Sequence, residues 1–78
     1  MIKLQILGTG CAKCATLALN ADVAARSLGL SYALEKVTDM NAIIDAGVMS
    51  TPALAIDGEV KSVGRVLSVQ EIKQILTA

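Results

Sequence analysis

The chain has 78 residues and no formal net charge, and 54% of its residues are hydrophobic although only one, Tyr32, is aromatic. The length predicts one domain over residues 1–78, and the balanced charge and the lack of stacking rings argue against a nucleic-acid partner. No uncharged stretch approaches the ~20 residues of a membrane span and no leader-like segment opens the sequence, so we expect a cytoplasmic protein with no membrane partner.

Strand-like and helix-like patterns alternate along the sequence. Side chains of opposite faces alternate in two segments, which predict strands at residues 2–7 and 31–37. Two more strands are predicted at residues 53–56 and 59–63, on either side of Asp57-Gly58. Apolar side chains recur at helical spacing in three other segments, which predict helices at residues 11–27, 40–46 and 68–76.

Turn and cap residues separate these elements. Gly29 suits the left-handed end of the first helix, and Asp57-Gly58 favours a tight hairpin turn between the last two strands. Ser68 and Glu71 have the spacing of a capping box, which marks the start of the last helix.

The predicted order is strand, helix, strand, helix, strand, strand, helix. Because a long helix joins the first two strands, they should run parallel through a right-handed crossover. The short turn between the last two strands makes that pair antiparallel. The fold class is therefore α/β, with a four-stranded mixed sheet and helices on both of its faces.

Cys11 and Cys14 form a CxxC pair at the junction of the first strand and the first helix. The start of a helix favours an anion, so the pKa of the Cys11 thiol should be lowered, and Lys13 adds a positive charge. A disulfide that closes so short a loop constrains the unfolded chain little, which argues against a structural bridge. The pattern indicates thiol–disulfide exchange, in which Cys11 attacks a substrate disulfide and Cys14 resolves the mixed disulfide.

The element order, the CxxC pair after the first strand and Thr51-Pro52 before the third strand resemble the thioredoxin superfamily over the whole chain. The likeness is greatest to small single-domain thioredoxin-like proteins of the redox-active disulfide type. It implies that Pro52 is cis and packs against the cysteine pair, and that Thr51 binds an extended substrate segment through its backbone. By the same likeness, Gly10 and Lys13 border the bound substrate.

The resemblance also implies partners and the absence of a cofactor. The substrates are expected to be disulfide-containing proteins, and the electron donor a flavoprotein similar to thioredoxin reductase or another thiol reductant. No metal or cofactor is expected, because the two thiols carry the chemistry.

Three features depart from the usual thioredoxin pattern. Gly10 replaces a tryptophan, and Ala12-Lys13 replaces the Gly-Pro pair between the cysteines. Gln5 replaces a buried strand carboxylate, and an amide cannot accept a proton as that carboxylate does. The redox potential, the deprotonation of Cys14 and the choice of partner therefore do not follow from the resemblance.

Two alternative functions fit part of the pattern. The cysteine pair could hold a soft metal ion such as Cu(I), but small metallochaperones end on a strand, whereas this sequence ends on a predicted helix. Two thiolates also cannot complete a tetrahedral zinc site, and the chain has no histidine. A non-catalytic binding domain would not need the cysteine pair. We therefore predict a thiol–disulfide oxidoreductase, with a metal-transfer module as the alternative.

Arg65 and Met49 have two interpretations each, and Met40 has one. Arg65 follows the fourth strand, in a region that helps to hold glutathione in glutaredoxins, but it can equally be a solvated arginine in a turn. Met40 and Met49 are predicted to pack in the interior, and Met49 could instead border the substrate groove.

Overall fold

The computed structural model describes residues 1–10 and 12–77, and it has the predicted order of elements. Where the bounds of an element differ from the prediction, they differ by one residue. The elements are β1 (Ile2–Leu7), α1 (Ala12–Ser27), β2 (Tyr32–Val37), α2 (Met40–Asp45), β3 (Ala53–Ile56), β4 (Glu59–Val63) and α3 (Val69–Leu76).

The four strands form one mixed sheet in the order β2-β1-β3-β4. As predicted, β1 and β2 are parallel and β3 and β4 are antiparallel, and the central pair of β1 and β3 is also antiparallel. The register places Leu7, the last residue of β1, beside Val37 of β2 and Ala53 of β3. The segment after β1 and the segment before β3 therefore meet at the same end of the sheet.

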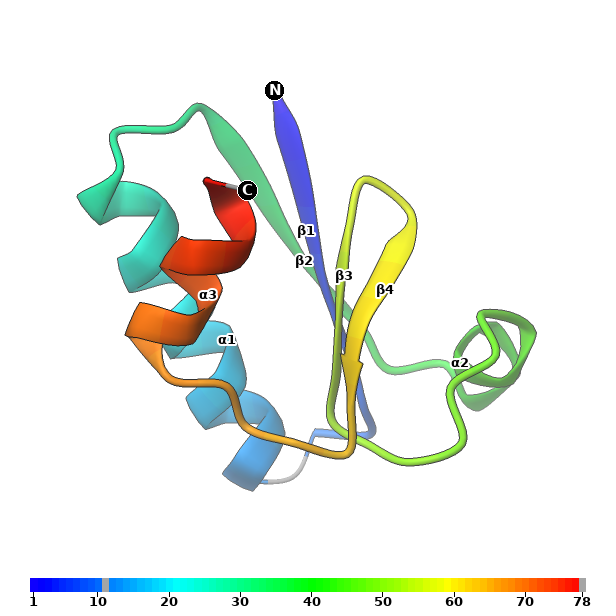
Figure 1. Ribbon diagram of the computed structural model, residues 1–78. Coiled ribbons are helices and arrows are strands. Elements are labelled where there is room, and N and C mark those ends of the chain that lie inside the picture. The colour runs from blue at the N-terminus through cyan, green and yellow to red at the C-terminus, as the bar shows by residue number, and fades with distance from the viewer. Residues whose placement is uncertain (11, 78) are drawn as a thin grey trace.

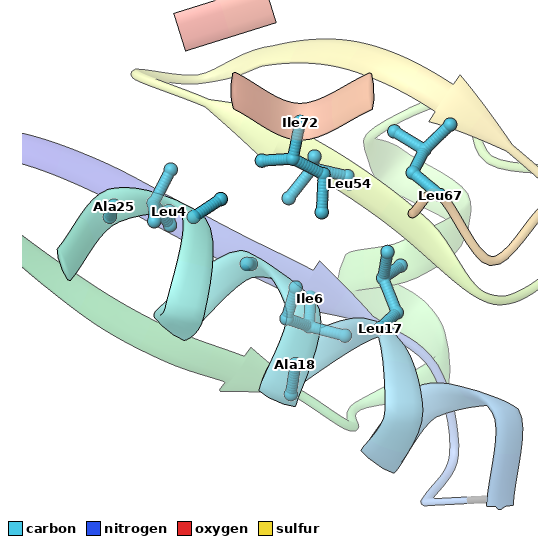
Figure 2. Packing of buried hydrophobic residues seen from close by; sticks show 10 residues of the cluster. Leu4, Ile6, Leu17, Ala18, Ala25, Leu54, Leu67 and Ile72 are labelled. Atoms are coloured by element: carbon cyan, nitrogen blue, oxygen red, sulfur yellow. The ribbon is translucent and has the colours of Figure 1, made fainter. Parts of the chain in front are cut away.

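Helices α1 and α3 lie side by side on one face of the sheet, and α2 lies on the other (Figure 1). Alanine side chains on α1 are small enough for the helix to approach the strands closely. Figure 2 shows Leu17 and Ala18 of α1 in one cluster with Ile6 of β1, while Ile72 of α3 lies over Leu54 of β3. Burial of these apolar side chains is the main stabilising contribution that the fold provides. The buried cluster on this face consists of Leu4, Ile6, Leu17, Ala18, Ala21, Ala24, Ala25, Leu54, Leu67 and Ile72.

The opposite face has a smaller buried cluster beneath α2. Its members are Leu7, Ile43, Val48, Ala53 and Ala55.

Beyond that cluster the same face carries polar side chains of β1 and β2. Glu35 accepts a hydrogen bond from the Gln5 side chain at 3.2 Å and lies 3.6 Å from the Lys3 ammonium group. Because Leu4 and Ile6 point toward α1, Gln5 points away from it. The amide that replaces the thioredoxin carboxylate is thus bonded to a surface carboxylate.

The predicted turn and cap residues adopt the expected conformations. Asp57 and Gly58 both have positive φ, at 51° and 84°, as a type I′ hairpin turn requires. Ser68 and Glu71 form the reciprocal hydrogen bonds of a capping box. No helix within the described part of the chain is long and apolar enough to span a membrane.

Candidate functional site

The CxxC sequence follows β1 and runs into the first turn of α1. Gly10 has a φ of 91°, a left-handed conformation that turns the backbone toward the helix. Cys11 lies outside the residues that the structure describes. Helix α1 starts at Ala12, and Cys14 is buried in its first turn with 6% of its surface exposed, whereas Lys13 is exposed. The first turn of α1 has no acidic side chain, so nothing in that turn opposes an anion at the helix start.

Gly8 lies between Cys14 and the loop that precedes β3. A Cβ atom added to Gly8 would overlap the sulfur of Cys14 and would lie 3.7 Å from the Cβ of Thr51. The Gly8 amide donates a hydrogen bond of 3.0 Å to the carbonyl of Val37, which ties this position to the end of β2. The fold therefore brings Cys14 and Thr51, which are far apart in sequence, close to one glycine.

The peptide bond between Thr51 and Pro52 is cis, as the family resemblance implies. Pro52 is fully buried, and its carbonyl accepts a hydrogen bond of 2.9 Å from the amide of Gly64 at the end of β4. Thr51 is exposed, and its backbone makes no hydrogen bond to another residue in ranges 1–10 and 12–77. This loop is thus held in place on one side and open to solvent on the other.

A small pocket of about 100 Å³ opens beside Cys14. The segment after β1 supplies Gly8 and Gly10 to its wall, and β2 and the residues after it supply Lys36 and Thr38. Lys36 is paired with Ile6 in the register of β1 and β2, so the two side chains lie on the same side of the sheet. The pocket beside Cys14 is therefore bordered by a cation, and its described lining includes no carboxylate.

A larger apolar groove of about 400 Å³ has Thr51 in its wall. No charged residue is among the described residues that line it. Three apolar side chains in its wall are largely open to solvent: Met40 is 51% exposed, Ile44 61% and Met49 94%. The remaining lining residues are Ile43, Gly47, Val48 and Thr51.

The prediction that Met40 and Met49 pack in the interior is wrong. Helix α2 has only six residues and buries a single side chain, Ile43, against the sheet. Met40 and Ile44 lie to the sides of that contact, and Met49 follows Gly47 in the loop after the helix. Met49 borders the groove beside Thr51, and the alternative that this groove receives the substrate stays a prediction.

Arg65 has a structural partner in α3. Its guanidinium lies 2.8 Å from the Glu71 carboxylate, which also accepts a hydrogen bond from the Ser68 amide. Two hydrogen bonds hold the pKa of Glu71 below its usual 4.5. The bond from the Ser68 backbone has the larger effect, and the bond from the Arg65 side chain has the next largest. The contact of Arg65 with the capping box favours an ordinary structural role.

Two features of this region were not predicted from the sequence. Gly8 was interpreted only as a break after the strand, because nothing in the sequence shows that the sulfur of Cys14 packs against it. The apolar groove could have been suspected from the short second helix, which carries more apolar side chains than one face can bury. Within the described ranges there is no cluster of three or more side chains of the kinds that bind metals.

Comparisons with known proteins cover almost the whole chain. A family model described as a thioredoxin domain matches residues 2–77. A thioredoxin of Methanothermobacter thermautotrophicus is 49% identical over 77 residues, covering 99% of this chain and 100% of that protein. A thioredoxin of Methanocaldococcus jannaschii is 40% identical over 76 residues, covering 97% of this chain and 87% of that protein.

Proposed function

The chain belongs to the thioredoxin family, a family of thiol–disulfide oxidoreductases, and we propose that it exchanges disulfides with proteins through Cys11 and Cys14. The observation that carries this proposal is the position of Cys14. It is buried in the first turn of a helix, next to Gly8, and Gly8 in turn lies close to Thr51. Such a position suits a thiol that acts after the substrate has already been captured.

Cys11 is proposed as the nucleophile. It directly precedes α1, whose positive end favours a thiolate, and the exposed Lys13 ammonium group follows in the same turn. The Cys11 thiolate attacks one sulfur of a substrate disulfide. The substrate bond breaks, its second sulfur leaves as a thiolate that takes a proton from solvent, and a mixed disulfide remains.

Cys14 is proposed as the resolving thiol. Its thiolate attacks the sulfur of Cys11, which forms the disulfide of the CxxC pair and breaks the bond to the substrate. The substrate sulfur that Cys11 had attacked leaves as a thiolate and takes a proton from solvent. Two electrons have then passed from the cysteine pair to the substrate, and the reverse sequence oxidises a dithiol.

The substrate is proposed to bind as an extended segment across Thr51. The open backbone of this residue can pair with a strand-like peptide, while Pro52 keeps the loop in shape and Gly10 and Lys13 border the other side. The groove beside Thr51 can receive an apolar substrate side chain, and methionines such as Met49 adapt to different shapes.

The electron donor and the compartment are proposed from the sequence and its resemblance alone. We expect a flavoprotein similar to thioredoxin reductase, or another thiol reductant, to regenerate the dithiol in the cytoplasm. The chain is proposed to act as one domain over residues 1–78.

Serine substitutions of the two cysteines test the assignment. With insulin as the disulfide substrate and dithiothreitol as the reductant, Cys11→Ser should lower turnover at least about a thousandfold, because the nucleophile is lost. Cys14→Ser should accumulate a covalent adduct with the substrate, detected by mass spectrometry. Thr16→Ser, on the exposed side of the same helix, is the matched control and should keep wild-type turnover.

Two outcomes would contradict these roles. Full turnover of Cys11→Ser would exclude it as the nucleophile. If Cys14→Ser reacts with the substrate but releases it as fast as the wild type, Cys14 is not the resolving thiol.

A further inference from the structure

Gly8 differs from the other glycines of the chain. The other five all have positive φ, whereas the backbone of Gly8 has a conformation that residues with side chains also adopt. Backbone strain therefore does not explain a glycine at this position. What excludes a side chain is the sulfur of Cys14, which occupies the space that a Cβ atom would take.

Both sides of this contact are anchored in the fold. The amide of Gly8 is bonded to the carbonyl of Val37, and the preceding residue, Leu7, is paired with both neighbouring strands. On the other side Cys14 is buried in the first turn of α1, and Leu17 and Ala18 of the next turn belong to the main buried cluster. Because residue 8 has no side chain, the sulfur of Cys14 can lie against its backbone.

We propose that Gly8 is a positioning residue for the resolving step, acting through the sulfur of Cys14. This inference rests on the proposed function of the cysteine pair. In that step the sulfur of Cys14 must reach the sulfur of Cys11 while the bond between Cys11 and the substrate breaks. A methyl group at residue 8 forces the sulfur of Cys14 to rotate about its χ1 angle or pushes the start of α1 away from β1. Because displacements of about 1 Å can slow a reaction about a hundredfold, we expect Gly8→Ala to slow resolution about tenfold to a hundredfold.

The two steps of the reaction can be followed separately with dithiobis(nitrobenzoic acid), an aromatic disulfide. Mixed with an equimolar amount of reduced protein, it releases one coloured thiolate when Cys11 attacks and a second when Cys14 resolves the adduct. Gly8→Ala should leave the first release within about twofold of the wild-type rate and slow the second. A purely structural defect would instead slow both releases or lower only the amount of active protein.

A double-mutant cycle with Cys14→Ala tests the contact itself. Without the sulfur, the nearest atoms to the added methyl group are the Cβ of residue 14 at 3.5 Å and that of Thr51 at 3.7 Å, which are ordinary van der Waals distances. Under reducing conditions, Gly8→Ala should lower the urea midpoint of the wild type and leave that of the Cys14→Ala variant unchanged. If Gly8→Ala alone does not fold, recovery of folding in the double variant supports the same contact.

Several results would overturn the proposal and are distinct from a failure of the proposed function. A wild-type second release in Gly8→Ala, or an equal loss of stability with and without the sulfur, would exclude the positioning role. If the wild type itself releases no second thiolate, the proposed exchange mechanism fails. The double-mutant cycle of urea midpoints still decides whether a side chain at residue 8 conflicts with the Cys14 sulfur.

Discussion

The two faces of the sheet are covered to different extents, and the difference separates stability from recognition (Figure 1). The face under α1 and α3 is closed over a continuous apolar cluster that includes Leu4 and Leu54. The face under α2 is closed only near the end of the sheet that holds Thr51, and Ile44 of α2 remains largely exposed. The first face anchors α1, and with it Cys14. The second leaves an apolar groove open at the site.

The largest effects on stability should come from the face under α1 and α3. Leu54→Ala removes a fully buried side chain from a cluster held between two helices and the sheet, and we expect it to cost about 3–4 kcal/mol of unfolding free energy. Ile43→Ala, under α2, should cost about 2 kcal/mol, because its short helix can settle into the space. Urea denaturation of both variants makes the comparison. An equal or larger loss for Ile43→Ala would refute the division between the faces.

An intermediate effect is expected at the capping box that starts α3. Ser68→Ala should cost about 1 kcal/mol, because the Glu71 amide loses its acceptor.

The same box makes stability depend on pH. Because the pKa of Glu71 is lowered in the folded state, its contribution is present above about pH 4.5 and is lost as the pH falls through the folded-state pKa. Glu71→Gln should therefore reduce the loss of stability in that acidic window, as measured by urea titrations at several pH values. An unchanged pH profile would show that the carboxylate does not support the helix.

The smallest effect on stability should come from the exposed wall of the groove. A double variant, Ile44→Ser with Met49→Ser, should change the unfolding free energy by less than about 0.5 kcal/mol, because neither side chain is buried. It should nevertheless raise KM for a protein disulfide about fivefold, since the apolar contact with the substrate is lost. Leu19→Ser, which removes an exposed apolar side chain from α1, is the control and should leave KM unchanged. If the wild type, the double variant and Leu19→Ser have similar KM values, the groove is not part of the substrate-binding site.

Much of the fold could be predicted from the sequence because local signals agree with the final structure. Alternating apolar residues mark the strands, and Ser68 with Glu71 marks the start of α3. The parallel pairing of β1 and β2 follows from the long helix between them. The pairing of β1 with β3, which brings the segment after β1 beside the loop that holds Thr51, was not predicted from the sequence. It depends on contacts between residues about 50 positions apart, which local periodicity does not record.

Side-chain packing at the site was less predictable. Met49 points outward because α2 is short and Met49 lies in the loop that follows Gly47. The apolar character of a methionine does not by itself predict this exposure. The contact between Gly8 and the sulfur of Cys14 depends on how closely α1 approaches β1. Such distances arise from packing of the whole domain. A glycine that the sequence marks only as the end of a strand can therefore turn out to make room for a neighbouring side chain.

The most direct test of the central claim is the midpoint potential of the Cys11–Cys14 pair. The protein is equilibrated in dithiol–disulfide buffers over a range of potentials, and its thiols are counted after acid quenching. The account predicts one reversible two-electron transition between two thiols and none, independent of added metal. A pair that never oxidises reversibly, or that does so only by linking two chains, would contradict dithiol exchange and make metal binding by the two thiols the function to examine.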